Sequence, residues 1–213
     1  FVQFDFPNAE GNPYKSNGGR MAWNDKLKRY IPEGWNDTSL GSLVRLEDSK
    51  RIPLSKSVRN SRQGIYPYYG ATGIMDYIDD YIYNGEYILL AEDGSTSDEN
   101  GFPIVQYIWG KTWVNNHAHI IKPKQHNHIL YWYFLLKMIP AKAIETGSIQ
   151  KKISQENLMP HRVIEPPTTL IDKFSAITRA IQDKRIRLQD EINMLNKLRD
   201  ELLPLLMNGQ VSV

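Results

Sequence analysis

The C-terminal part of the chain contains a heptad repeat that no glycine or proline interrupts. Both residue types are absent from Thr168 to Leu203, and large apolar residues recur every seven positions. We expect one continuous coiled-coil helix over 168–204, about 50 Å long at about 1.5 Å per residue. Because such a helix cannot bury its apolar stripe against one small domain, it requires a second long helix.

This heptad seam has a polar interruption at its middle. Lys184 and Glu191 occupy core positions, and polar core residues often fix the register and partner of a coiled coil. The segment Thr169–Asp172 resembles a capping box that would start the helix. A simple dimerisation coil without a spacing role would show the same pattern. The residues expected to pair with another helix are Phe174, Ile177, Ile181, Leu188, Leu195, Leu198 and Leu202.

The sequence before this helix predicts an α+β (mixed α/β) globular domain over 35–167, with mostly antiparallel or mixed sheets. Short β-branched and aromatic runs alternate with turn residues. The predicted strands are 40–46, 73–77, 87–91, 104–109, 113–121, 149–153 and 163–165, with helices at 126–139 and from Ser154. Residues 1–34 are rich in turn residues and aromatics and are expected to form an irregular lead-in packed on the domain. Residues 205–213 are expected to form a C-terminal tail.

Composition excludes several kinds of function. The 213 residues contain no cysteine, which excludes disulfides, thiolate zinc sites and a cysteine nucleophile, and is typical of a cytoplasmic protein. The net charge of +2 is not that of a polycation but allows one basic face. The apolar run 129–139 is shorter than the ~20 residues that a bilayer requires, so we expect a buried helix and no membrane span. Because the chain starts at Phe1, we expect it to be a piece of something longer.

Motifs for group transfer are missing from the sequence. An adenine methyltransferase needs a glycine-rich cofactor turn and an Asn/Asp-Pro-Pro-aromatic site, whereas Glu165–Thr168 has only the two prolines. The segment Gly110–Thr112 has the last three letters of a phosphate-binding loop but lacks its first glycine. We therefore assign no catalytic residue and no cofactor to this chain.

A metal site has weak support. His117 and His119 could place two imidazoles on one strand face, with carboxylates from Glu92 and Asp93, but the spacing marks no further ligand. The segment Asp48–Lys50 has the acid-x-lysine spacing of many nucleases without an evident acidic partner. No metal ligand is predicted. A stand-alone metal-dependent nuclease and a coiled-coil scaffold that binds protein remain alternatives.

Three segments, 50–69, 115–117 and 146–152, favour contact with double-stranded DNA. Basic residues follow one another over 50–62 with no acidic residue between them, and tyrosines follow at 66–69. Basic side chains neutralise phosphates, and arginine, tyrosine, asparagine and glutamine can contact the backbone or base edges. The acidic residues in 76–80 and 98–99 are expected to lie away from DNA. The candidate DNA-binding residues are Lys50, Arg51, Arg59, Arg62, Tyr68, Asn116, Gln150, Lys151 and Lys152.

An ordered set of phrases covers nearly the whole chain and resembles the specificity subunits of type I restriction-modification enzymes. The phrases are PYKSNGG (13–19), IPEGW (31–35), LGSL (40–43), YPYYGATGI (66–74), LLAEDGS (89–95), VNNHAHII (114–121), GSIQKKIS (147–154) and LLMNGQ (205–210). No single phrase is decisive, but their order is specific.

The resemblance implies a noncatalytic specificity subunit. Family members carry two target recognition domains, each followed by a long helix, and the two helices pack antiparallel and set the gap in a bipartite DNA target. Members dock modification subunits, which bind S-adenosylmethionine and methylate adenine, and the assembly recruits ATP-dependent, Mg²⁺-requiring restriction subunits. This chain has half of that pattern. The resemblance therefore implies a half-length subunit or part of a full one, which pairs through its helix with a second copy or a second half.

Overall fold

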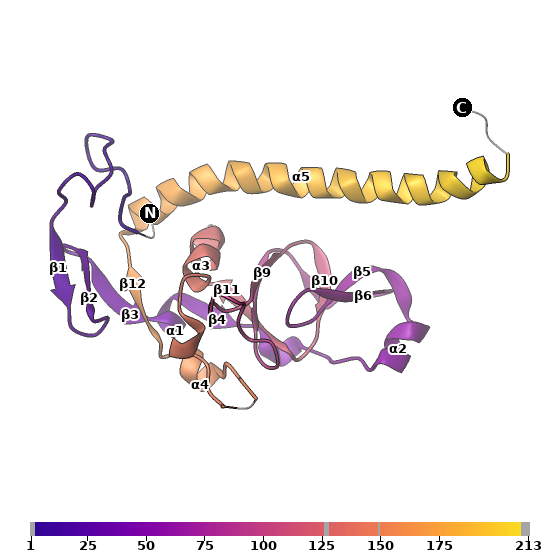
Figure 1. Cartoon of the computed structure of the whole chain (residues 1–213), viewed down its shortest axis with the longest axis horizontal. Helices are drawn as coiled ribbons and strands as arrows, with labels where there is room; N and C mark the ends of the chain where they lie inside the picture. Colours follow the sequence, from indigo (N-terminus) through magenta and orange to yellow (C-terminus); the bar gives the residue numbers. More distant parts are fainter. Residues whose placement is uncertain (1–2, 126–127, 149, 210–213) are drawn as a thin grey trace.

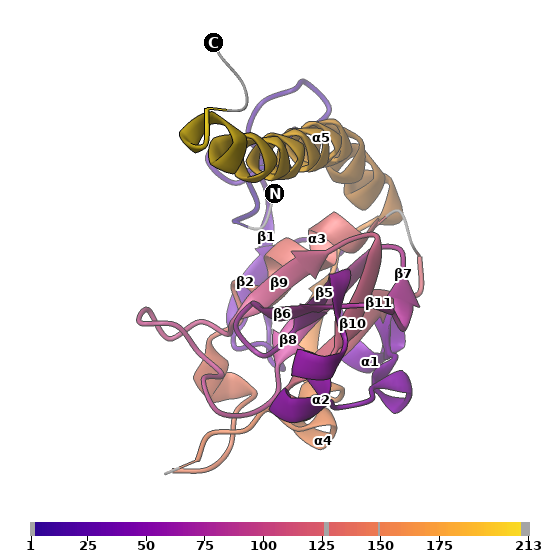
Figure 2. The same cartoon turned by 90° about the vertical axis from the view of Figure 1, so that its right-hand side faces the viewer.

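The computed structural model describes residues 3–125, 128–148 and 150–209. A globular domain built from small sheets lies beneath one long helix that runs along its side (Figures 1 and 2). The strands are β1 (Met21–Asn24), β2 (Arg29–Pro32), β3 (Asn36–Ser39), β4 (Val44–Leu46), β5 (Gln63–Tyr69), β6 (Ile74–Ile78), β7 (Tyr83–Asn84), β8 (Tyr87–Ala91), β9 (Val105–Ile108), β10 (Lys111–Val114), β11 (Ala118–Pro123) and β12 (Arg162–Glu165). The helices are α1 (Leu40–Leu43), η1 (Asp48–Lys50), α2 (Lys56–Ser61), α3 (Ile129–Leu136), η3 (Ala141–Ala143), α4 (Gln155–Leu158) and α5 (Thr168–Met207).

The central layer is an antiparallel sheet in the order β4-β11-β8-β9. Successive residues of a strand point to opposite faces. Ile88 and Leu90 of β8 accordingly join the large core cluster that includes α3. Leu89 of β8 and Ile120 of β11 join a second cluster on the other face. All five residues of β8 are buried, so this strand forms the middle of the core.

A second sheet, in the order β6-β5-β10-β7, covers that other face. Val114 of β10 and Tyr83 of β7 pack in the same cluster as Leu89 and Ile120. The β5–β10 pair is parallel, while β5–β6 and β10–β7 are antiparallel. The domain therefore has the predicted α+β class with mostly antiparallel, mixed sheets.

The lead-in is more regular than predicted. Strands β1 and β2 form a hairpin in which Trp23 lies opposite Tyr30. Its turn is fixed by the Asn24 side chain, which accepts hydrogen bonds from the backbone of Lys26 and Leu27, as in an Asx turn. Phe4, Phe6 and Ile31 form a separate buried cluster that Trp35, Ile164 and Leu170 complete, so the segment packs on the domain.

Several predicted elements have different bounds. The predicted strand 40–46 begins as a helical turn, α1, and only its end is strand β4. The predicted strand 113–121 is two strands, β10 and β11, joined by a turn. Strands β3 and β5 and helix α2 were not predicted. In 149–153 the described residues form no strand beyond bridges at Lys152, and position 149 lies outside the described residues. Helix α3 is shorter than the helix predicted over 126–139, and positions 126–127 lie outside the described residues.

The long C-terminal helix is confirmed as one continuous element. Helix α5 has 40 residues and continues past the expected end, with Pro204 inside its last turns. Pro204 cannot donate the usual backbone hydrogen bond to Asp200, so the helix is weakened locally just before its end at Met207. The prediction that Thr169–Asp172 forms a capping box is wrong. The helix begins after Pro167, and no side chain caps its first turn. Proline suits a helix start because it cannot donate a backbone hydrogen bond.

Only the first half of α5 contacts the domain. Ile171, Ser175 and Gln182 are buried on one face, and Asp172 Oδ1 lies 2.7 Å from His128 Nε2 next to α3. The Arg185 guanidinium lies 5.7 Å from the ring centre of Trp109. From position 187 to 207 every residue is exposed, and Figure 1 shows this part running on beyond α3. Among the described residues, no helix combines the length and hydropathy needed to cross a bilayer.

Candidate nucleic-acid interface

The beginning of the predicted basic segment and the other two segments predicted to contact DNA meet at one end of the central sheet. Glu92, directly after β8, lies between them. Arg51 Nη1 donates to Glu92 Oε2 at 2.6 Å and to the backbone carbonyl of Asn116 at 3.3 Å. Lys152 Nζ lies 3.3 Å from Glu92 Oε1. The residues 50–51, 115–117 and 150–152, which are far apart in the sequence, are therefore parts of one surface.

The exposed side chains of this surface are polar or basic. Lys151 and Lys152 are half exposed, and Lys151 Nζ lies 2.9 Å from Glu145 Oε1. His117 lies beside Asn116 in the β10–β11 turn, and its Nδ1 is 2.6 Å from Asp93 Oδ1. We call this set the loop surface; its exposed members are Lys50, Asn116, His117, Gln150, Lys151 and Lys152. It offers cations for phosphates together with amide and imidazole groups that can hydrogen bond to bases.

The side chains beneath the loop surface form a polar and ionic network, which we call the Glu92 cluster and in which Asp48 and His119 are buried. Its members are Asp48, Arg51, Glu92, His119 and Gln155. His119 Nδ1 lies 2.6 Å from Asp48 Oδ2, and its Nε2 lies 2.7 Å from the carbonyl of Ile153. Gln155 Nε2 donates to Asp48 Oδ2 at 2.8 Å. These contacts join η1, β8, β11 and the segment before α4, so the cluster holds the loops in place.

Arg51 was predicted to contact DNA, but the structure places its side chain largely within the protein. Its side chain is only 13% exposed, and besides Glu92 it donates to the carbonyls of Asp48 and Ala118 at 3.1 and 2.9 Å. A guanidinium has five N–H donors, and most are used inside the protein. Arg51 therefore positions the loop surface.

The pKa of Asp48 is lowered despite its position in the core. Burial alone raises the pKa of this carboxyl, but the hydrogen bonds from His119 and from the backbone of Ile120, and the charge of Arg51, outweigh it. Ile120 N donates to Asp48 Oδ1 at 2.7 Å. Because the folded protein favours the ionised form, ionised Asp48 stabilises the fold above the ordinary carboxyl pKa.

Replacing this carboxylate makes stability less dependent on acid pH. Asp48→Asn is expected to lower the free energy of unfolding by about 2 kcal/mol at pH 7, since a charged hydrogen-bonding group is lost. The stabilisation by Asp48 is present above about pH 4 and disappears as pH falls through its lowered folded pKa. Urea titrations between neutral and acid pH should therefore show the two stability curves converging in acid. Asp190→Asn, at an exposed position of α5, is the control; a constant gap between wild type and Asp48→Asn would contradict the prediction.

The Glu92 cluster contains the only group of possible metal ligands found among the described residues, but cations of the protein already occupy it. Ligand atoms of Asp48, Glu92 and His119 lie within 4.8 Å of one another. Arg51 contacts both carboxylates, at 3.6 Å from Asp48 and 2.6 Å from Glu92. A metal ion would have to displace this guanidinium. The pair of imidazoles considered from the sequence also fails to converge, because His117 is exposed and bonded to Asp93 while His119 is buried.

The predicted residues near α2 lie outside the loop surface and are largely neutralised. Arg59 Nε lies 3.3 Å from Asp76 Oδ2 and its side chain is 12% exposed. Arg62 Nη2 lies 2.8 Å from Asp79 Oδ1. The acidic residues at 76–80, which are expected to lie away from DNA, are close to this basic run because strand β5 pairs with strand β6. Arg62 is partly exposed, and Arg59 is held within the fold.

Two other candidate DNA-binding residues, Tyr68 and Lys50, differ in how far their side chains are exposed. Tyr68 is 1% exposed, and its hydroxyl accepts a hydrogen bond from Leu54 N at 3.0 Å. The side chain predicted to contact DNA is therefore buried in this structure. Lys50 is 57% exposed and pairs with Glu47, and the hydrogen bond to this carboxylate raises the pKa of the lysine. Lys50 remains available at the edge of the loop surface.

The residues predicted to pair with another helix form an exposed stripe, with one exception. Phe174 packs edge-on against Tyr131 and Phe134 of α3, with ring centres 5.7 and 5.9 Å apart. This first seam position therefore contacts its own domain. The helix stripe, as we call the rest, is 39–66% exposed and consists of Ile177, Ile181, Leu188, Leu195, Leu198 and Leu202. An apolar row of this length on one face of a helix is typical of a coiled-coil partner surface.

The structure combines a domain that has a polar loop surface with one long helix that has an exposed apolar stripe. The family model of the type I restriction modification DNA specificity domain matches residues 32–190. The chain belongs to this family.

Individual relatives agree with the family assignment. The chain is 35% identical to a putative type I restriction enzyme specificity subunit of Haemophilus influenzae over 65% of this chain and 37% of that protein. It is 27% identical to the MjaIX specificity subunit of Methanocaldococcus jannaschii, covering 94% and 49%. The S subunit of M. genitalium has a similar fold, with a TM-score of 0.60 at 17% identity over 81% of this chain and 46% of that one. The chain thus spans about half or less of the length of these relatives.

Proposed function

We propose that this chain recognises one half of a bipartite DNA target as part of a type I restriction-modification specificity subunit, and that it catalyses no reaction itself. The family match over 32–190 carries this proposal. The fold supports it, since one domain is attached to one unbroken helix of 40 residues. The nuclease alternative lacks support because the histidines do not converge, and the scaffold alternative does not account for the family match.

The loop surface is the proposed contact with DNA. Lys151 and Lys152 supply charge for phosphates, while Asn116 and Gln150 supply amides that can bond to adenine edges. All four are exposed and lie above the Glu92 cluster. Because the cluster fixes the loops in the free protein, little ordering is needed upon binding. Lys50 and Arg62 are secondary candidates for phosphate contact at its margin.

The helix stripe is the proposed contact with the rest of the specificity subunit. Its occupant is a second long helix, either from a second copy of this chain or from the other half of a full subunit. In this arrangement α5 sets the distance between two recognition domains. The family supports docking of modification subunits, which would bind S-adenosylmethionine, and of restriction subunits, which would bind ATP and Mg²⁺. The proposal places the protein in the cytoplasm with the DNA it would bind.

Methylome mapping tests the proposed function. Cells that contain the modification subunit are compared with and without this chain, and methylated adenines are located by long-read sequencing. If the chain pairs with a second copy, its two-fold symmetry predicts a new methylated motif of two inverted, identical half-sites separated by a fixed gap. The variant Lys151→Gln/Lys152→Gln should reduce methylation at this motif. An unchanged methylome would contradict the proposal.

Removal of the two loop lysines should weaken binding to all DNA sequences alike. For Lys151→Gln/Lys152→Gln, the slope of log affinity against log salt should become shallower by about 1–2, since each lost phosphate contact releases one counterion fewer. We expect a change in slope near the lower end of this range, because Glu145 and Glu92 partly neutralise the two lysines. The matched control is Lys173→Gln/Lys197→Gln on α5, where both lysines are exposed. Fluorescence anisotropy at several salt concentrations measures the slopes, and equal slopes for both variants would exclude the phosphate role.

A further inference from the structure

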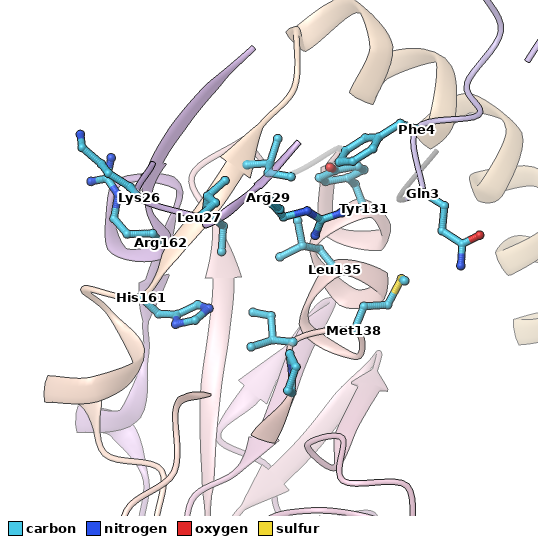
Figure 3. A pocket seen from close by; sticks show the side chains of 14 residues that line it. Gln3, Phe4, Lys26, Leu27, Arg29, Tyr131, Leu135, Met138, His161 and Arg162 are labelled. Atoms are coloured by element: carbon cyan, nitrogen blue, oxygen red, sulfur yellow. The ribbon is translucent and has the colours of Figure 1, made fainter. Parts of the chain in front are cut away.

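A cavity of about 610 Å³ opens between the lead-in, α3 and β12. Its volume is that of a typical small-molecule site. The floor is apolar and buried, with Phe4 from the lead-in, Leu135 and Ile139 from the region of α3, and Val163 from β12. Figure 3 shows these elements surrounding one space. The cavity is separate from the residues of the loop surface and the helix stripe.

The charged groups that line this cavity are all cationic. Lys26, Arg29 and Arg162 line it, and none of its lining residues is acidic. Arg162 Nε donates to Asp37 Oδ2 at 2.6 Å, and Lys26 lies 4.0 Å from the same carboxylate. Arg29 differs, because among the described residues it has no ion pair. Its guanidinium instead lies over the ring of Phe4, 5.0 Å from the ring centre. Stacking on a ring leaves the N–H donors of the guanidinium free to bind an oxyanion.

Two further polar groups face the cavity without a hydrogen-bond partner among the described residues. Tyr131 is 5% exposed, and its side chain lines the cavity. His161 also lines it, and burial lowers the pKa of its imidazole, so the ring is uncharged at neutral pH. Figure 3 shows Arg29 reaching from β2 toward Tyr131, and the His161 ring directed into the same space. A hydroxyl and an imidazole at the wall of a cavity can form hydrogen bonds with a ligand or with water.

We propose that this cavity binds a small organic anion, with an apolar body against Leu135 and Ile139 and an oxyanion bound by Arg29. The guanidinium forms two parallel hydrogen bonds to a carboxylate or phosphate group. The Tyr131 hydroxyl and the His161 ring bond to polar atoms nearer the body. An apolar body is required because most of the lining is aliphatic or aromatic. The bound anion joins the lead-in to α3 and β12, and so stabilises their packing.

Calorimetric titration with 3-phenylpropanoate tests this site in the full chain, with uncharged 3-phenylpropanamide and inorganic phosphate as comparison probes. We expect saturable one-to-one binding of the carboxylate, at least tenfold weaker binding of the amide, and no matching affinity for phosphate. Saturation should also raise Tm by about 5 °C at a hundredfold excess over Kd. Absence of binding at millimolar carboxylate, or equal affinity for the amide, overturns the proposal.

Two variants locate the binding to this cavity. Arg29→Gln should weaken carboxylate binding at least about tenfold, since hydrogen bonds to charged groups are the strong ones. The matched control is Lys28→Gln, which removes the same charge from a neighbour that does not line the cavity. Tyr131→Phe keeps the ring and should weaken binding about threefold. If Arg29→Gln and Lys28→Gln bind the carboxylate equally, the site lies elsewhere and the proposal fails.

Discussion

Leu188→Asp/Leu195→Asp is expected to weaken helix pairing at least a hundredfold without unfolding the chain. Both leucines belong to the helix stripe and are 48% and 57% exposed in the single chain. Pairing with a second helix would bury them, and each buried leucine contributes about 1.5–3 kcal/mol. In a pair of identical chains the double variant places four carboxylates at the seam, so the loss exceeds the ~2.7 kcal/mol of a hundredfold change.

Sedimentation equilibrium across the micromolar range measures the dissociation constant of the pair. The matched control is Gln189→Asp/Asn193→Asp, which adds the same charge at positions on the outer face of the same helix turns. These two side chains are exposed and hydrogen bonded to each other at 3.2 Å. The control should pair like the wild type, and circular dichroism should show equal helix content in all three proteins. A monomeric wild type, or equal dissociation by both double variants, would contradict pairing of two copies through the helix stripe.

The long helix was predictable because its information is local. The seven-residue repeat and the absence of glycine and proline are properties of one uninterrupted segment. They required no knowledge of the rest of the fold. Strand β8 was similarly clear, since a short run of large apolar residues between polar residues indicates a buried strand. The helix stripe could be defined from the same repeat, except where Phe174 has a partner in α3 that only the fold reveals.

The candidate site was less predictable because its contacts connect distant residues. Gln155 and Asp48 are 107 positions apart, and Arg51 and Glu92 are 41 positions apart. A basic residue in a run is expected at the surface, and no local pattern shows that a carboxylate will meet it in the core. The exposure of Arg59 was equally hard to predict, because its partner Asp76 belongs to a strand 17 positions later in the chain. The residues that hold the loops were therefore missed, although Glu92 and His119 had been noted as possible ligands.

Some misplaced elements did have local signals. Ser55 accepts a hydrogen bond from Val58 N at 3.3 Å and so caps α2, and serine is a favoured residue at that position. The hairpin of β1 and β2 was harder to see because its strands have only four residues each and are partly exposed on both faces. Its aromatic pair, Trp23 and Tyr30, with ring centres 5.3 Å apart, becomes recognisable only when the two strands are aligned.

Arg51→Met is expected to lower the free energy of unfolding by about 3–5 kcal/mol, because it removes the guanidinium cation that contacts both largely buried carboxylates. For a protein of this size the corresponding fall in Tm is roughly 10 °C. The arginine side chain is 13% exposed and contacts both Asp48 and Glu92. The matched control is Lys50→Met, the adjacent residue in the chain. Its side chain is 57% exposed, so the same loss of charge should leave Tm nearly unchanged, since exposed groups are screened by solvent.

The comparison of these two variants distinguishes a positioning role from direct contact with DNA. If Arg51 positions the loops, Arg51→Met lowers Tm and changes the ratio of specific to nonspecific affinity, because Asn116 is no longer linked through Arg51 and Glu92 to Lys152. If it instead contacts phosphates directly, the variant keeps the wild-type Tm and loses affinity equally for all sequences. Thermal unfolding and anisotropy titrations against specific and random duplexes separate these outcomes. Lys50→Met should keep the wild-type Tm and lose affinity equally for all sequences, since the Lys50 charge lies at the surface and would interact with DNA only through phosphates.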